Sequence, residues 1–205
     1  MNINSKVIIL GDSITRHYYP YACKRLLVYG IESFEPERKT SCQWKQIRFL
    51  NRTLTTRRRY NGKRFDAGFV HFNFGLHSIK LPNKGKDILH KRTSELDFKK
   101  YEIELFEQIL ILKKLKVIPL FSNTTPSPRN HSVRNNEDVI TLNKIAKHVM
   151  KEMKVPYNDL YSFVLNHPKS NELYKNMELQ NNCHFAEVGR KSLGENVAEF
   201  IKNNI

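Results

Sequence analysis

The stretch VIILGDS at residues 7–13 decides the fold of this 205-residue chain. Its four adjacent apolar residues end at Gly11, and such an uninterrupted run indicates a strand that is buried on both faces. Directly after the glycine, Asp12 or Ser13 can cap a helix with apolar residues at helical spacing, although Pro20 is expected to limit its first turns. The sequence therefore predicts a buried strand that leads at once into a helix.

The same order of strand and helix is repeated along the rest of the chain. The expected strands cover residues 7–10, 31–34, 67–74, 117–121 and 155–157. After the first helix, further helices are expected at residues 43–54, 95–115, 137–153 and 188–201. This alternation predicts an α/β three-layer α/β/α sandwich around a mainly parallel five-stranded sheet. The binding crevice of such a fold lies at the carboxyl ends of its strands.

Length and composition are typical of one globular domain that spans residues 1–205. The first residues contain no apolar run long enough for a signal peptide or a membrane span, so a cytoplasmic location without a transmembrane segment is expected. Three cysteines at scattered positions favour reduced thiols over a disulfide framework or a metal site.

The net charge of +15 is the strongest deviation in composition, and it predicts attraction to polyanions. The densest cluster of this charge is a basic patch of Arg57, Arg58, Arg59, Lys63 and Arg64. Two interpretations stay open: a patch that binds an anionic substrate, nucleic acid or membrane surface, or a solvated loop between a helix and a strand. The sequence contains no recognisable nucleic-acid motif, so nucleic acid is not an expected partner.

Ser13 and His184 are the candidate reactive pair. A serine hydroxyl is a weak nucleophile, so it needs a base within hydrogen-bond reach and donors for the oxyanion that forms. Between a strand and a helix, Ser13 is expected at the sheet edge, with its backbone N–H directed at the reacting oxygen. His184 lies just before the last helix and could reach the same edge. Taken alone, each has an ordinary interpretation, as an N-cap serine and a surface histidine.

Several short blocks together resemble the SGNH, or GDSL, hydrolase family. GDSIT at 11–15 matches the nucleophile block, FNFGLHS at 72–78 resembles the third block, and NNCHF at 181–185 resembles the block that holds the histidine. TTP at 124–126 and NDLY at 158–161 resemble secondary features of bacterial esterase-like members. The resemblance covers nearly the whole chain.

This resemblance implies a flavodoxin-like fold and an acyl-enzyme mechanism on Ser13, with His184 as general base and then general acid. It implies neither a metal nor another cofactor. Family substrates are esters and thioesters, commonly acetyl groups on carbohydrates. We therefore expect a small-molecule or carbohydrate ester as the substrate, and the net charge is compatible with an anionic one.

The sequence departs from the family at the position of the triad acid. Asn181 stands three residues before His184, where the family has an acid. An amide can accept a hydrogen bond from the imidazole but brings no charge, which weakens the expected activity. A Ser–His dyad oriented by a backbone carbonyl, or by a carboxylate such as Glu178 or Asp159, stays open.

The oxyanion hole departs from the family as well. His77 stands in place of the family's asparagine, and its ring N–H can donate the same kind of hydrogen bond. Asn73, two residues before Gly75, is the alternative donor. The glycine of the second block is not evident, so the backbone N–H beside that of Ser13 would come from Ser41 or Cys42, and Ser41 is the chosen candidate. Asp12 is expected to fix the turn rather than to carry a proton.

The sequence thus predicts a serine esterase, and an O-deacetylase is the favoured activity. Two alternatives remain. An O-acyltransferase would use the same residues up to the acyl-enzyme and then transfer the acyl group to an acceptor hydroxyl. A catalytically impaired module of the same fold would bind an anionic polymer through its basic surface, and Asn181 and the net charge motivate this second alternative.

Overall fold

The computed structural model of the chain describes residues 6–35, 59–60, 63–64, 67–79, 93–127, 134–174 and 183–205. Its elements in chain order are β1 (Lys6–Gly11), α1 (Ser13–Val28), β2 (Glu32–Phe34), β3 (Arg59–Tyr60), β4 (Lys63–Arg64), β5 (Phe69–Asn73), α3 (Glu95–Lys114), β6 (Ile118–Ser122), α4 (Asn136–Glu152), β7 (Tyr157–Asn158), α5 (Leu160–Leu165), the 3-10 helix η2 (Ser170–Glu172) and α6 (Glu187–Lys202).

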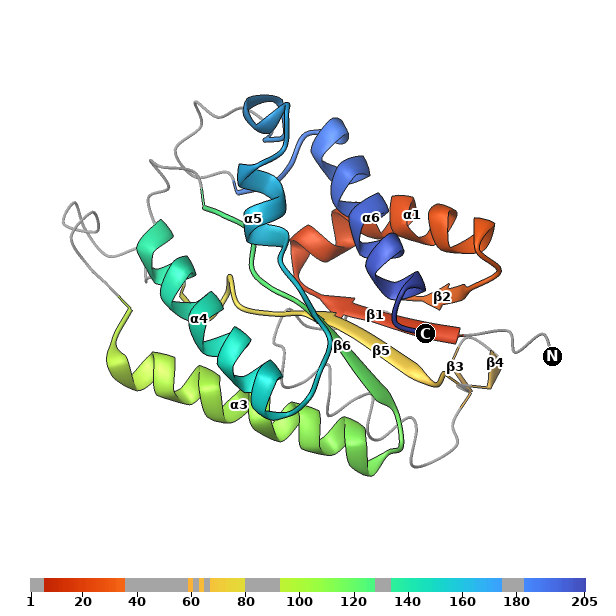
Figure 1. Ribbon diagram of the computed structural model, residues 1–205, viewed down its shortest axis with the longest axis horizontal. Helices are drawn as coiled ribbons and strands as arrows, with labels where there is room; N and C mark the ends of the chain where they lie inside the picture. The colour runs from red at the N-terminus through yellow and green to blue at the C-terminus, as the bar shows by residue number, and fades with distance from the viewer. Residues whose placement is uncertain are drawn as a thin grey trace.

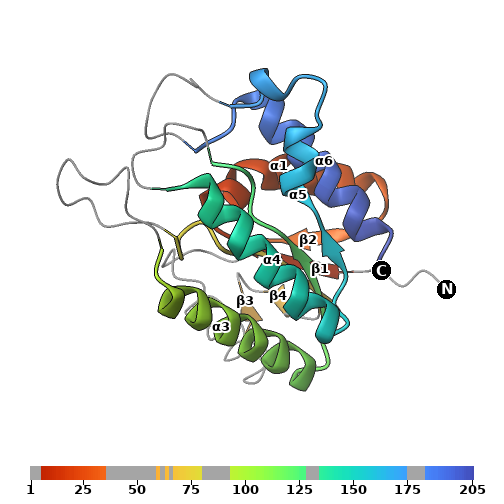
Figure 2. The ribbon, with the colours of Figure 1, turned by 60° about the vertical axis from the view of Figure 1, so that its left-hand side comes forward.

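In the described part of the chain, five strands form one parallel sheet in the order β2-β1-β5-β6-β7. Figures 1 and 2 show α1 and α6 side by side over one face of the sheet and α3 and α4 over the other. The predicted three-layer α/β/α sandwich with a parallel five-stranded sheet is therefore confirmed.

The strand order reverses direction between β1 and β5. From β1 the chain continues to β2 on one side, and it returns to β5 on the other side. A crevice opens at such a switch point, beyond the carboxyl ends of the two strands. These ends are Gly11 and Asn73, which are partners in the parallel ladder. The fold thus places the GDS segment at the position where ligands bind in α/β sheets.

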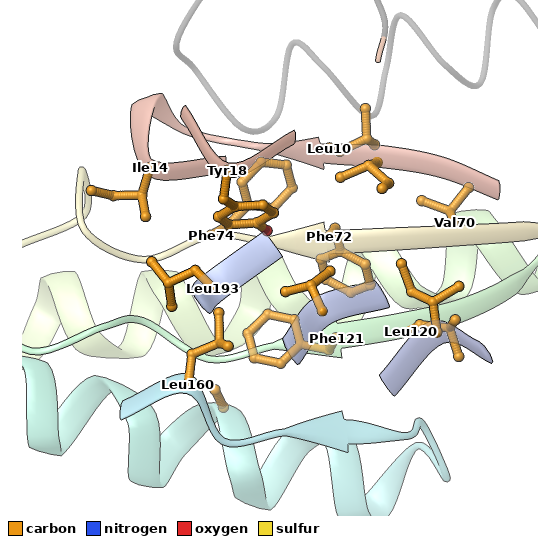
Figure 3. Close-up of a cluster of buried hydrophobic side chains, with 14 of the residues drawn as sticks. Leu10, Ile14, Tyr18, Val70, Phe72, Phe74, Leu120, Phe121, Leu160 and Leu193 are labelled. Atoms are coloured by element: carbon orange, nitrogen blue, oxygen red, sulfur yellow. The ribbon is translucent and has the colours of Figure 1, made fainter. Parts of the chain in front are cut away.

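The core explains why the first strand has no polar alternation. Val7, Ile8 and Ile9 are completely buried, because helices cover both faces of the sheet at its central strands. Figure 3 shows how the buried side chains of the strands and their covering helices gather into one cluster. In this cluster, the rings of Phe72 and Phe121 pack edge to face, with centroids 5.1 Å apart. The burial of these large apolar groups stabilises the sheet that carries the site.

Helices α1 and α6 approach each other closely at Gly194. A Cβ atom at this position would lie 2.7 Å from the carbonyl oxygen of Tyr18 and 2.8 Å from the backbone nitrogen of Ala22. Only glycine permits this separation without a shift of one helix. The contact matters for the site, because α1 begins at Ser13 and α6 begins three residues after His184.

Helix α3 has favourable charges at both ends. Ser94 caps its N-terminus and accepts a hydrogen bond from the backbone of Asp97. Glu95 and Asp97 lie in the first turn, while Lys113 and Lys114 lie in the last, as the helix dipole favours. None of the helices in the described part of the chain is both long and apolar enough to cross a membrane.

Pro20 does not limit the first helix as the sequence predicts. Helix α1 starts at Ser13 and continues through Pro20 to Val28. A proline at this position removes the hydrogen bond to the carbonyl of Arg16. Both residues are on the exposed side of the helix, so water can satisfy that carbonyl. The apolar face of the helix is therefore maintained across the proline.

Two short elements differ from the sequence-based expectation. Part of the basic turn forms a two-stranded antiparallel ladder between β3 and β4, in which Arg59 pairs with Arg64. Helix α5 was not predicted, because only six residues separate its cap from its end. Asp159 caps it by accepting hydrogen bonds from the N–H and hydroxyl of Ser162. The helix predicted at residues 43–54 lies outside the described residues.

Candidate active site

Ser13 is the first residue of α1, directly beyond the end of β1. Asp12 occupies the N-cap position, and its Oδ1 accepts a hydrogen bond from the N–H of Ile14 at 2.8 Å. Because Asp12 caps the helix, the Ser13 hydroxyl is not needed for capping. The interpretation of Ser13 as an ordinary N-cap is thus wrong, and Asp12 has the turn-fixing role expected from the sequence.

His184 approaches this hydroxyl from the opposite end of the chain. Its Nε2 lies 3.0 Å from the Oγ of Ser13, although the two residues are 171 positions apart in the sequence. This distance is within hydrogen-bond range, and both side chains are half-buried. The structure thus brings together the serine and the histidine that the sequence proposes as a pair.

Contacts on its C-terminal side anchor the segment that carries His184. The neighbouring Phe185 is buried and forms an isolated antiparallel bridge with Tyr174, with the two rings stacked at 4.5 Å between centroids. The hydroxyl of Tyr174 donates to the carbonyl of Pro126, in the TTP segment after β6. These contacts hold the segment that carries His184 against the segment that follows β6.

The surroundings of His184 favour the neutral imidazole. Burial lowers the pKa of His184 below its ordinary value of 6.5, and Asp12 opposes this shift by raising the pKa. Three cationic or ionisable groups lower the pKa further, namely Arg134, Arg190 and His77. At neutral pH His184 therefore has an unprotonated nitrogen that can accept a proton from Ser13.

His17 lies against the ring of His184. The two ring centroids are 4.9 Å apart, with 58° between the ring planes. Since His17 is the fourth residue after Ser13, both project from the same side of α1. This helical spacing could have revealed His17 from the sequence, but the sequence analysis did not single it out.

Asn73 and Gly75 shape the end of β5 beside Ser13. The Nδ2 of Asn73 donates to the carbonyl of Asn123 at 2.9 Å and so ties the end of β5 to the end of β6. Gly75 has a φ of 158°, and a Cβ there would lie 2.1 Å from the Oγ1 of Thr124. These two residues hold the ends of β5 and β6 together, which is a supporting role.

His77 lies in the turn that follows Gly75, and its side chain is exposed. It is close enough to His184 to lower the pKa of that imidazole. Because the amide of Asn73 is used between the strands, His77 is the more accessible of the two candidate oxyanion donors. Its role as a donor stays a prediction.

Several candidate residues cannot be placed in this site. Ser41, Asn181 and Glu178 lie outside the described residues, as do Arg57 and Arg58 of the basic patch. Arg59 belongs to β3, and Lys63 and Arg64 belong to β4, where the structure describes the backbone alone. The expected anion patch and the residue that replaces the triad acid are therefore still predictions.

Asp159 does not orient His184. Its carboxylate accepts hydrogen bonds from Asn123 and Ser162 at the end of β7, away from the imidazole. Burial alone would raise the pKa of Asp159, but these hydrogen bonds outweigh burial and lower it. The carboxylate therefore stabilises the start of α5.

Arg134 and Arg190 are site residues that the sequence analysis missed. Arg190 lies near the start of the last helix, and its Nε donates to the carbonyl of Phe185 at 2.9 Å. Arg134 precedes α4, and its Nε donates to the carbonyl of Leu76 at 2.9 Å. Arg134 is brought next to His184 by the fold alone, whereas Arg190 is near in sequence but belongs to no recognisable motif. The described residues contain no cluster of three histidine, cysteine or acidic side chains that could hold a metal ion.

No model of a known protein family matches the sequence, and no curated protein matches it either. Solved structures do match along almost the whole chain. A lipase/acylhydrolase from Enterococcus faecalis is 16% identical with a TM-score of 0.71, and the alignment covers 98% of this chain and 96% of that one. A GDSL-like lipase from Bacteroides thetaiotaomicron is 13% identical with a TM-score of 0.68, covering 100% of this chain and 91% of that one.

The chain has the GDSL hydrolase fold. A variant of an acetyl xylan esterase from Geobacillus stearothermophilus shares it as well, at 14% identity and a TM-score of 0.67, with 98% of this chain and 97% of that one covered. The GDSL hydrolase fold is thus maintained here with few identical residues, as expected when buried strands and covering helices determine the architecture.

Proposed function

We propose that this chain is a serine ester hydrolase in which Ser13 is the nucleophile and His184 transfers the protons. The 3.0 Å distance between the Ser13 Oγ and the His184 Nε2, at the switch point of the sheet, carries this proposal. Two further observations support it: Asp12 takes the capping role, which leaves the hydroxyl for chemistry, and the lowered pKa keeps His184 neutral.

In the first step, the Oγ of Ser13 forms a bond to the ester carbonyl carbon while its proton passes to the Nε2 of His184. The C–O bond to the alcohol then breaks, and the imidazolium gives this proton to the alcohol oxygen. The acyl group remains on Ser13. In the second step, water forms a bond to the acyl carbon while His184 accepts its proton. The bond between this carbon and the Oγ of Ser13 then breaks, the imidazolium returns the proton to Oγ, and the carboxylic acid is released.

The negative charge on the carbonyl oxygen needs donors during both steps. The backbone N–H of Ser13 is suited to this, because the first N–H groups of a helix have no acceptor within the helix. His77 and Ser41 are the other proposed donors. Asp12 adds its negative charge near His184, which favours the imidazolium and offsets part of what Asn181 lacks as an acid.

We propose acetyl esters of carbohydrates as the substrate class. The support is the similarity to an acetyl xylan esterase and to lipase/acylhydrolases of the same fold. The proposed mechanism contains no step that depends on the alcohol, so small aryl acetates are suitable reporters.

The test has two parts: acetate release from acetylated xylooligosaccharides, and 4-nitrophenol release from 4-nitrophenyl acetate. Quenching the second reaction in acid should trap an acetyl group, which mass spectrometry of the digested protein would locate on the peptide that contains Ser13. If neither substrate is cleaved, or if the acetyl group forms on another serine, the proposed function is wrong.

A further inference from the structure

Two arginine side chains contact the residues on either side of His184. The Nη1 of Arg134 donates to the Sγ of Cys183 at 3.6 Å, so this arginine contacts the residue before the histidine. Arg190 contacts the residue after it through the hydrogen bond to the carbonyl of Phe185. Both arginines therefore lie next to the proposed reaction centre, although they come from different segments.

Each guanidinium is fixed by its Nε. Arg134 uses this nitrogen on the carbonyl of Leu76, and Arg190 uses it on the carbonyl of Phe185, both at 2.9 Å. Arg190 fixed in this way presents its terminal nitrogens as a planar fork, which matches the oxygens of a carboxylate or phosphate. The Nη1 of Arg134 already contacts Cys183, so Arg134 contributes chiefly its positive charge. Part of the entropy lost on binding an anion has already been lost in the folded protein.

The charge of Arg190 is not balanced by a carboxylate in the described part of the chain. By contrast, Arg25 on α1 lies 3.1 Å from the carboxylate of Glu199 on α6. Arg190 also belongs to the first turn of α6, where the helix dipole disfavours a cation. Helix stability therefore gives no reason for a positive charge at this position.

These cations oppose the proposed chemistry when no substrate is present. Arg134 and Arg190 both lower the pKa of His184, so they disfavour the imidazolium that forms when Ser13 attacks. A negative group bound between the arginines and the ester would screen them and restore the imidazolium. The arrangement therefore favours a substrate that brings its own negative charge.

We propose that Arg190 binds an anionic group of the substrate and that the positive charge of Arg134 adds to the attraction, so that the preferred ester carries a carboxylate or phosphate close to the scissile bond. This inference rests on the proposed function, because it concerns the substrate of the same site. The anion belongs to either the acyl part or the alcohol part of the ester, and the test distinguishes them.

Two matched pairs of esters provide the test. For the alcohol part, 4-acetoxybenzoate is compared with its neutral methyl ester. For the acyl part, 4-nitrophenyl hydrogen succinate is compared with 4-nitrophenyl methyl succinate. We expect kcat/KM to be at least about tenfold higher for the anionic member of one pair, as one charge-assisted hydrogen bond would give. The pair that shows the preference identifies the part that carries the charge.

Arg190→Gln should reduce that anionic-to-neutral ratio to near one, whereas Arg25→Gln, which removes the same charge from the distant α1–α6 surface, should leave it unchanged. Arg134→Gln should lower the ratio as well, because it removes the second positive charge next to His184. Because each ratio is measured on one protein sample, it does not depend on how much of a variant is folded.

Equal kcat/KM within both pairs would overturn this inference while leaving the proposed function in place. The same holds if Arg25→Gln lowers the ratio as much as Arg190→Gln, because the effect would then come from net charge alone. If none of the four esters is hydrolysed, both the inference and the proposed function are wrong.

Discussion

The pair of Ser13 with His184 and the pair of Ser122 with His71 look alike at the level of atoms. In each, a serine Oγ lies within hydrogen-bond distance of a histidine Nε2, at 3.0 Å in the first and 2.7 Å in the second. The shorter contact belongs to the pair in the core. Distance alone therefore does not identify the serine that acts as a nucleophile.

The surroundings of the two pairs differ. Ser122 and His71 are completely buried, and burial lowers the pKa of His71 to about 3. The Ser122 hydroxyl also accepts a hydrogen bond from Asn158, so the core encloses it. Ser13 is half-buried at the start of a helix, and charged groups on several segments act on its histidine. Access, backbone donors and nearby charge are the reasons for proposing the Ser13 pair, and not the core pair, as the catalytic one.

The largest expected effect comes from removing one hydroxyl from each pair. Ser13→Ala should lower kcat for 4-nitrophenyl acetate by about 10⁴-fold, because the acyl-enzyme can no longer form. The matched variant Ser122→Ala should retain activity within a few-fold and lose stability instead, by about 1–3 kcal/mol for a broken buried hydrogen bond. Equal loss of activity in the two variants would erase the distinction between the pairs.

The next effect concerns the core pair and the way it makes the stability of the folded protein depend on pH. His71 is neutral in the folded protein down to a pKa of about 3, whereas an unfolded histidine takes up a proton near 6.5. The unfolded state therefore binds more protons between these values, and stability falls as pH decreases from 6.5 towards 3. The contribution of His71 approaches about 1.4 kcal/mol per pH unit.

His71→Gln should remove this contribution. Urea unfolding at pH 7, 5 and 4 would measure it as a shallower loss of stability in the variant than in the parent protein. An identical pH dependence in both proteins would show that His71 is not the group held neutral by the core.

A smaller effect is expected at the active-site pair from Asp12→Asn. Asparagine caps a helix as well as aspartate does, so α1 should stay intact. The lost charge no longer raises the pKa of His184, so the acid limb of the kcat/KM profile should move to lower pH. Turnover should fall by about tenfold, because the imidazolium loses a stabilising charge. If both the pH profile of kcat/KM and the turnover are unchanged, the role of Asp12 is only to cap α1.

The sequence predicts the fold better than it predicts the composition of the site. The apolar run at residues 7–10 and the repeated order of strand and helix were sufficient for the three-layer sandwich, because burial on both faces leaves a clear pattern. Ser13 and His184 could be proposed as a pair through the resemblance of their two short blocks. Arg134 could not, since its contact is with the backbone carbonyl of Leu76 on a distant segment. Arg190 could not either, because its contact with the nearby carbonyl of Phe185 matches no recognisable sequence motif.

The most direct test of the difference between the two pairs is to treat the protein with a fluorophosphonate and to locate the adduct by mass spectrometry. A single adduct on Ser13 is expected in the parent protein and in Ser122→Ala, and none in Ser13→Ala. His184→Gln should react far more slowly, because no base then activates the hydroxyl. An adduct on any other serine, or unchanged labelling of Ser13→Ala, would contradict the assignment of Ser13 as the nucleophile.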